Sequence, residues 1–441
     1  MLYTHKLLAE LEAKAERLAG FQDDYGRRLE AYRAALAALG ARYPTASTLA
    51  RAQRELLADE SAGAAPTAEY DTWRARGAGG APLLPFGMAF AHHAEARAWA
   101  EGLRGVTTFA VDGSQLLPWR DASVPLALVQ VGIFENPHQP PAPYTKDIML
   151  ELLTPDDLLG GGRPDPAAGA DDGSGLADDD APGGAQIASE ETVHLRRFQL
   201  EARAIVERME RHAQRDGSGD GSGDGGLVVG LLDGSLIVSF ALKMSPAYRA
   251  AYVSAARSLL EASARCRVPL VAYIDTSYAR DVVGMLRHLA PDALPDVAGP
   301  PLPAPRGIHD ALLWQGALAW GDRTPAFLSA RGDVLAGGYG EAKGDIAFVY
   351  LQTALDRPPA RLEFPRWVLE AGLLDRVMDA VRAEVIAGNG YPYPLEAADA
   401  VAVIALADRA QFYQIFQRFA QQRGLAFSFS RKALSKSRRR V

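Results

Sequence analysis

The 441-residue sequence is almost without cysteine. A single residue, Cys266, excludes an intrachain disulfide, a cysteine-ligated zinc site and an iron–sulfur cluster. The sequence also lacks an apolar run of the roughly 18 residues that a membrane span needs. Six charged residues interrupt the first twenty positions, so no signal peptide is expected. We therefore expect a soluble, cytoplasmic protein without a role at a membrane.

Negative charge is concentrated in two short segments. The formal net charge is −7, and residues 156–191 carry −9 while residues 216–224 carry −3. The last eleven residues contribute +6, which leaves the rest of the chain near neutral. The acidic total therefore does not exclude a nucleic-acid partner, because a basic tail suits phosphates or an acidic protein as well as serving solubility.

Residues 1–60 have the apolar spacing of helices. One apolar face covers Leu7–Leu18, and a second, after Gly20, covers Tyr25–Leu36 and ends at Gly40. Such faces either pack on the body of the protein as a helical hairpin or dock on a partner.

The following apolar runs predict an α/β fold with a mixed sheet flanked by helices. Strands are expected at Thr107–Val111, Val124–Phe134, Asp147–Leu153, Leu227–Leu232, Val268–Ile274, 345–353 and 360–364. Helices are expected at about 92–104, 190–213, 246–265, 279–290 and 366–387, with a helix pair after Leu395. The first three strands have no helix-length connection between them, which favours an antiparallel meander.

Two segments have compositions typical of disorder. Residues 155–190 are rich in Gly, Asp and Ala, and residues 215–226 contain the repeat GSGDGSGDGG. We expect a helical region over 1–104, one α/β domain over 105–430 that contains both insertions, and a basic tail over 431–441.

Two of the expected strands end in the same tripeptide, Asp-Gly-Ser. Asp112 follows the first strand and Asp233 follows the fourth. Each aspartate alone is typical of a turn or a helix cap. If the strands are neighbours, however, the two carboxylates converge and repel unless a hard cation such as Mg²⁺ or Mn²⁺ lies between them.

Two further acids are candidates for the same site. Glu201 lies beside the apolar face of its helix, because Phe198 and Ile205 flank it at −3 and +4. Taken alone it is more typical of a surface acid than of a ligand. Asp399 falls in the first turn of a helix expected to begin near Glu396, where it either stabilises the helix dipole or faces a metal.

These motifs together resemble the NurA nuclease family. They are VDGSQ at 111–115, the helical Glu201, LLDGSL at 231–236 and GYPYPLEAAD at 390–399. The resemblance implies an RNase H-like fold and a DNA nuclease that depends on Mn²⁺ or Mg²⁺, with two ions in the site, and that has 5′→3′ exonuclease and single-strand endonuclease activity. It also implies a homodimer that works with a hexameric HerA-type translocase on DNA ends in double-strand break repair.

The resemblance assigns roles by position. Asp112, Glu201 and Asp233 correspond to metal ligands, and Tyr391 corresponds to an active-site tyrosine. The family usually has histidine where this sequence has Asp399, which can ligate a hard cation but cannot act as an imidazole acid or base.

Candidate DNA contacts lie elsewhere in the sequence. After the strand Val268–Ile274, Tyr278 is suited to stacking on a base and Arg280 to a phosphate. Lys343 lies in a Gly-rich stretch. The tail adds Arg431, Lys432, Arg438, Arg439 and Arg440.

Two other functions stay open. The residue at position 399 leaves room for a non-catalytic DNA-binding adaptor that kept the fold and lost the chemistry. An actin-like ATPase has a related fold, but the sequence has no glycine-rich adenosine loop and no repeat in its second half. The eight histidines form no HExxH motif.

Overall fold

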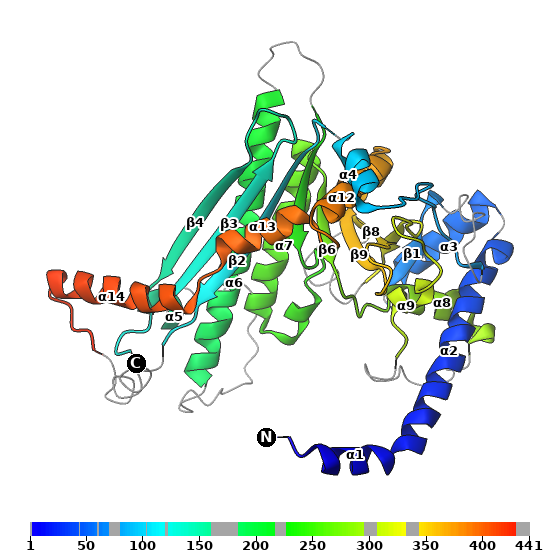
Figure 1. The fold of residues 1–441 in the computed structure, drawn as a ribbon, viewed down its shortest axis with the longest axis horizontal. Coiled ribbons are helices and arrows are strands. Elements are labelled where there is room, and N and C mark those ends of the chain that lie inside the picture. Colours follow the sequence, from blue (N-terminus) through cyan, green and yellow to red (C-terminus); the bar gives the residue numbers. More distant parts are fainter. Residues whose placement is uncertain are drawn as a thin grey trace. The chain divides into compact units, whose positions relative to one another are not determined.

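The structure is a computed structural model. It describes residues 2–43, 45–59, 61–69, 80–102, 104–119, 122–159, 184–216, 226–294, 307–331 and 344–428. The chain divides into two units, each made of separate stretches (Figure 1). Unit 1 contains Met1–Ala91, Tyr273–Ala336 and Gly340–Leu369, and unit 2 contains His92–Ala272, Gly337–Tyr339 and Glu370–Val441.

Unit 2 is built on a mixed sheet. Strands β2 (Thr107–Leu116), β3 (Ala127–Asn136) and β4 (Thr145–Leu153) form an antiparallel meander, as their short connections predict. Strand β5 (Val228–Asp233) pairs with β2 in parallel, which requires a long crossover. Helix α6 (Gly184–Asp216) is part of that crossover. The mixed α/β architecture expected from the sequence is confirmed, while its RNase H-like character stays a prediction.

The two faces of this sheet are covered by different helices. Successive side chains of a strand point to opposite faces. On one face, Phe109 of β2 stacks on His212 of α6. On the other face, Thr108 donates a 2.6 Å hydrogen bond to Glu384 of α12 (Leu374–Ala387). The sheet of unit 2 therefore lies between α6 and the helices near the C-terminus of the chain.

The remaining helices of unit 2 complete these layers. Phe134 of β3 meets the ring of Tyr393 edge to face, which places α13 on the α12 side. The remaining helices are α4 (His93–Glu101), α5 (Pro155–Leu159), η3 (Ser239–Lys243), α7 (Pro246–Cys266), α13 (Tyr393–Ala402) and α14 (Leu406–Arg423). Strand β6 (Leu270–Ile274) follows α7. Cys266 is buried at the end of α7.

Unit 1 has a second set of strands, antiparallel to one another. Their order is β1 (Ala64–Pro66), β7 (Phe327–Ser329), β8 (Ile346–Leu351) and β9 (Ala360–Pro365). All residues of these strands are buried, so both faces are covered. The helices are α1 (Thr4–Glu12), α2 (Ala15–Arg42), α3 (Ala46–Ala58), α8 (Asp281–Leu289), η4 (Pro291–Ala293), α9 (Asp310–Trp314) and α11 (Arg366–Glu370).

A buried ionic network joins α8, α9 and the strands of unit 1. Arg361 on β9 contacts Asp281 at 2.7 Å and Glu363 at 2.8 Å. Asp310 accepts hydrogen bonds from the first backbone amides of α8 and from Tyr350 at 3.1 Å. The pKa of Asp310 is raised to about 7, first by burial and then by the charge of Asp281, while the α8 amides and Arg361 oppose the rise.

Several element boundaries differ from the expectations. The first helix breaks between Glu12 and Ala15, and α2 runs through Gly20 without interruption. The helix expected over 366–387 is divided into α11 and α12 near Gly372, whose φ of +67° a helix does not accommodate. Strands β1 and β7 had no counterpart in the prediction, because three residues are too few for a periodic pattern.

The N-terminal helices bury one of their two predicted apolar faces. Tyr32 and Leu36 are buried, whereas Leu7, Leu8, Leu11 and Leu18 are exposed among the described residues. Arg33 of α2 donates to the carbonyl of Leu312 at 2.8 Å, which ties this helix to its own unit.

The predicted insertions lie partly outside the described residues. Residues 160–183 and 217–225 are not described, but 155–159 form α5 and α6 begins at Gly184. The ends of the segment expected to be disordered over 155–190 are thus helical. In the part of the chain that is described, no helix has the length and apolar character to cross a membrane.

Candidate metal centre

Asp112 and Asp233 lie side by side on neighbouring strands of unit 2. Val111 is paired with Leu232, so the next residue of each strand is one of the two aspartates. β5 ends at Asp233, whereas β2 continues to Leu116. The expectation that Asp112 ends its strand was therefore wrong, since pairing with β3 carries β2 onward. The predicted convergence of the two carboxylates is found where β5 stops.

Glu201 reaches this place from α6, across the backbone of Gly113. A Cβ on Gly113 would overlap Oε1 of Glu201 and lie 2.8 Å from Cγ of Arg197. Only glycine permits this approach of helix and strand. Glu201 is 7% exposed, so the view that it resembles a surface acid was wrong. Its burial was hidden in the sequence because it sits at the border of the apolar stripe.

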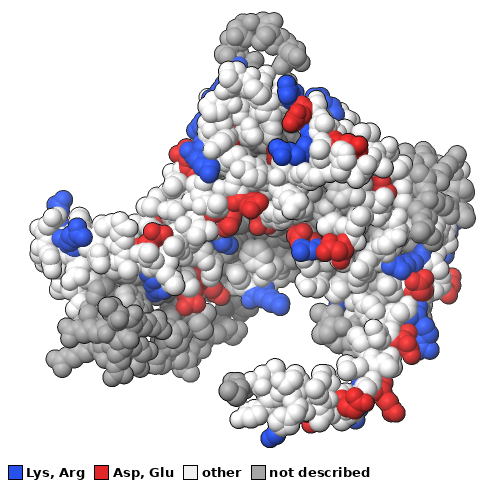
Figure 2. Space-filling model, in the orientation of Figure 1, with Lys and Arg blue, Asp and Glu red and all other residues white. Residues whose placement is uncertain are grey.

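Asp399 comes from α13, on the opposite face of the sheet. A Cβ on Gly132 would lie 2.6 Å from the carbonyl oxygen of Ala398 and from the amide nitrogen of Ala402. Gly132 is paired with Asp112, so its missing side chain lets α13 come down beside that aspartate. Because α13 begins at Tyr393, Asp399 lies in its second turn and not in the first turn as expected. Figure 2 shows acidic side chains gathered over α13, where Glu396 and Asp399 are exposed.

The electrostatics of these carboxyl groups are unfavourable when they are all ionised. The pKa of Asp112 is raised to about 6, first by burial and then by the nearby Asp233 and Asp399, while a hydrogen bond from the Gly113 amide opposes the rise. The pKa of Glu201 is raised to about 7, first by burial and then by the charges of Asp112 and Asp233, while the Arg197 charge opposes the rise. The four acids are therefore close enough to repel one another, and a cation would relieve that repulsion.

Arg197 is a member of this cluster that the sequence did not reveal. Its Nη1 donates to the carbonyl of Gly113 at 3.1 Å, and its Nε lies 3.5 Å from Oε1 of Glu201. The i, i+4 spacing of Arg197 and Glu201 on one helix was the available signal, but such pairs are common on solvated helix faces.

The four carboxylates are close together but are not arranged as a set of metal ligands. Among the described residues, no group of three or more His, Cys, Asp or Glu side chains is arranged to hold a metal ion. The donor set nevertheless fits a hard divalent cation, because it consists of carboxylates that repel one another in its absence.

Tyr391 lies half-buried in the turn between α12 and α13. Asn389 and Gly390 have φ angles of +55° and +117°, and a Cβ on Gly388 would overlap the carbonyl of Tyr391.

The predicted DNA contacts lie in unit 1 or outside the described residues. Tyr278 is exposed, and its ring meets that of His309 at 5.1 Å. Arg280 is half-buried, and its guanidinium packs where a side chain at Gly307 would lie. Lys343, Arg431, Lys432, Arg438, Arg439 and Arg440 lie outside the described residues.

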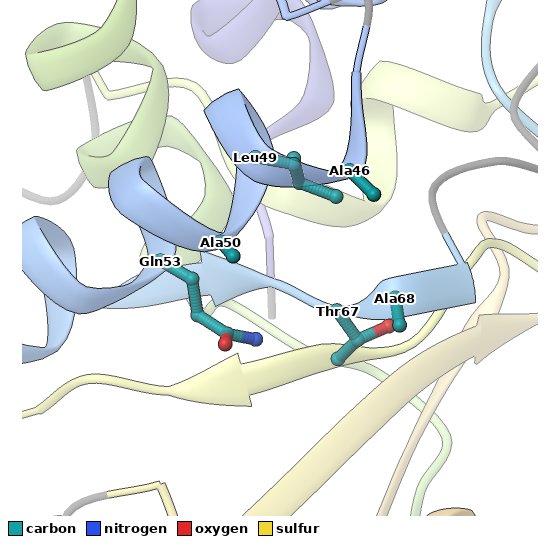
Figure 3. A pocket seen from close by; sticks show the side chains of 6 residues that line it. All are labelled: Ala46, Leu49, Ala50, Gln53, Thr67 and Ala68. Carbon is teal, nitrogen blue, oxygen red and sulfur yellow. The ribbon is translucent and has the colours of Figure 1, made fainter.

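A small pocket of about 90 Å³ in unit 1 is unrelated to the acids (Figure 3). Its lining is Ala46, Leu49, Ala50, Gln53, Thr67 and Ala68. The Gln53 side chain already donates to the carbonyl of Pro66 at 2.7 Å. None of these described lining residues is ionisable, so they offer no acid or base for catalysis.

A family model described as the NurA domain matches residues 106–404. No curated protein matches. A crystal structure of NurA with manganese is 9% identical, with 71% of this chain and 89% of that chain covered and a TM-score of 0.36. A structure of NurA bound to dAMP and manganese is also 9% identical, covers 68% of this chain and 85% of that chain, and has a TM-score of 0.31.

Proposed function

The chain belongs to the NurA domain family, and we propose that it is a deoxyribonuclease that depends on a divalent cation. The observation that carries the proposal is the convergence of Asp112, Glu201 and Asp233, with Asp399, from both faces of one sheet. Neighbouring ionised carboxylates repel one another and so destabilise the fold, whereas together they can bind a divalent cation.

The proposed site uses each acid as a metal ligand. Asp112 and Asp233 would hold Mn²⁺ or Mg²⁺ from adjacent strands, Glu201 from α6, and Asp399 from α13. When bound, a pair of such ions supplies an activated water and neutralises charge on the leaving oxygen of a phosphodiester. Arg197 holds the Glu201 carboxylate over Gly113 and favours its ionised form. We assign Tyr391 to the active site from its place in the family motif.

The finer parts of the proposal come from the family. They are 5′→3′ exonuclease and single-strand endonuclease activity, a homodimer, action with a HerA-type hexameric ATPase in end resection during double-strand break repair, and a cytoplasmic location. Tyr278, Arg280, Lys343 and the basic tail are proposed to contact DNA. Exposed Tyr278 is available for stacking, whereas half-buried Arg280 needs to leave its place over Gly307 to reach a phosphate.

The test is cleavage of end-labelled single-stranded and duplex DNA with Mn²⁺, Mg²⁺ or EDTA, with and without the translocase. We expect Asp112→Asn and Asp233→Asn to lower the rate at least about a hundredfold, because each removes a charge from the metal site. Glu396→Gln, an exposed acid of α13, is the matched control and should cleave at the wild-type rate. Wild-type cleavage by folded Asp112→Asn would refute the site.

A second candidate is a non-catalytic DNA-binding adaptor. The observation in its favour is that the described carboxylates are not arranged as a ligand cage. It predicts that the wild-type protein binds DNA but cleaves none with any divalent cation, alone or with the translocase. Metal-dependent cleavage that Asp112→Asn abolishes would exclude it.

A further inference from the structure

Strand β4 is the outermost strand of unit 2 (Figure 1). In the part of the chain that is described, β3 is its one partner, so the backbone groups along its other edge face outward. Its nine residues contain no proline or glycine to interrupt pairing. A long edge strand of this kind is a template for another strand unless it is protected.

One face of β4 carries a row of exposed apolar side chains. Ile148, Leu150 and Leu152 are 52%, 57% and 43% exposed, and Tyr144 just before the strand is 58% exposed. They share a face because their positions differ by two. Exposed large apolar side chains in a contiguous row are typical of an interaction surface.

The other face of β4 is occupied by its own unit. Asp147 contacts Arg208 of α6 at 3.0 Å, and Glu151 lies 4.0 Å from Arg196 of the same helix. The alternation of acids toward α6 and apolar residues away from it shows that the strand is held in register. The exposed row is therefore a feature of the folded unit and not of a strand free to turn over.

We propose that β4 pairs with β4 of a second copy of this chain, antiparallel, with the two-fold axis at Leu150. In this register Leu150 opposes its own copy, and Ile148 opposes Leu152 twice. The inference rests on the homodimer proposed above and names the surface that forms it. Its test reads association and not nuclease activity, so either can fail without the other.

Charge selects this register over its neighbours. If the two-fold axis lay at Met149 instead, Ile148 would oppose Leu150. Asp147 of each copy would then oppose Glu151 of the other. Moving the axis to Glu151 sets that carboxylate against its own copy. Like charges directly opposite each other across strands are destabilising.

The register centred on Ile148 is disfavoured for a different reason. It places the ammonium of Lys146 opposite the apolar side chain of Leu150, and so desolvates a positive charge without placing a carboxylate opposite it. Only the axis at Leu150 sets the three exposed apolar residues of the strand against one another without opposing two carboxylates. The row is thus complementary to itself, as a two-fold interface requires.

The first experiment is disulfide trapping in the full-length protein. Cys266 is buried, so an introduced cysteine is the reactive one. In the proposed pairing, the two Leu150 Cα atoms are roughly 4.5–5.5 Å apart, within disulfide range. The two Leu152 Cα atoms are about 13 Å apart, four residues along the strands.

Leu150→Cys should therefore give a covalent dimer under mild oxidation, and Leu152→Cys should not. Equal trapping of both variants, or trapping of Leu152→Cys alone, would overturn the register. Failure of both variants, with the wild type monomeric at tens of micromolar in sedimentation, would overturn the interface.

The second experiment exchanges charge across the axis. Ile148→Glu with Leu152→Glu sets carboxylates against each other and should shift the protein to monomer by at least about tenfold in Kd. Ile148→Lys with Leu152→Glu makes opposite pairs in this register and should restore the dimer. Leu355→Glu, at an exposed leucine of unit 1, controls for added charge. Circular dichroism checks folding, and a dimer that survives the double glutamate variant would refute the proposal.

Discussion

Gly113 of β2 lies so close beneath Glu201 of α6 that a side chain at position 113 would occupy the place of the glutamate carboxylate. The glycine of the first Asp-Gly-Ser tripeptide thus has a defined task. It brings a helix acid onto the sheet one residue after Asp112. The same relationship explains why a buried glutamate is accepted there, since Arg197 bridges the Gly113 carbonyl and the Glu201 carboxylate.

The first prediction concerns Gly113→Ala. The added methyl group must displace Glu201 or Arg197, so we expect a loss of about 1–3 kcal/mol in the free energy of unfolding and a loss of nuclease rate of about tenfold or more. Urea denaturation and the Mn²⁺ cleavage assay measure the two effects. Gly26→Ala on α2, where nothing lies within 4 Å, should keep full activity. A fully active, equally stable Gly113→Ala protein would contradict the packing described here.

The second prediction separates stability from activity at Glu201. The pKa of about 7 means that the folded protein binds this proton more tightly than the unfolded chain does. Above pH 7 the ionised carboxylate therefore opposes folding, and Glu201→Gln should raise the free energy of unfolding at pH 8 by about 1–2 kcal/mol without metal. The same change should abolish metal-dependent cleavage. Glu207→Gln, at an exposed position of the same helix, should alter neither.

The third prediction concerns Arg197. Its charge lowers the pKa of Glu201, so Arg197→Met should raise that pKa. The acidic limb of the pH–rate profile should then move upward by about one pH unit. Arg203→Met removes an exposed arginine that pairs with Glu207 on the same helix and should leave the profile in place. A uniform fall in rate at every pH, with no shift of the limb, would assign Arg197 a merely structural role.

The fourth prediction concerns the pH dependence of stability in unit 1. The folded-state pKa of Asp310, about 7, lies above its ordinary value of 3.8, so the folded state binds this proton more tightly. The stabilisation of the folded state by the proton on Asp310 is therefore complete below about pH 4, and it is lost as the pH rises toward 7. Asp310→Asn should flatten the fall of the urea midpoint across this window, whereas exposed Asp356→Asn should not. Asparagine has one acceptor oxygen fewer for the α8 amides, so the variant also loses stability at every pH. The test is therefore the slope of the urea midpoint against pH and not its absolute value.

Local patterns were sufficient for much of unit 2. The meander of β2, β3 and β4 followed from apolar runs with short connections, and most of helix α6 followed from a long amphipathic segment. The pairing of β2 with β5, which brings Asp112 to Asp233, needed one further assumption, that strands with like ends are neighbours. Strand β7 was not predicted, because its three residues are all buried and are too few to show a periodic pattern.

The sequence by itself determined the chemistry of the candidate site: carboxylates after apolar segments, glycines beside them, and the order of motifs that marks the NurA family. Tertiary structure alone decided the positions of the side chains. Three features depend on which surfaces meet in the folded chain. They are the burial of Glu201, the close approach of α13 to Gly132 and the exposure of the β4 edge. The physical reason is that periodicity reports the apolar face of one element, whereas burial, close approach and pKa depend on the neighbour that covers it.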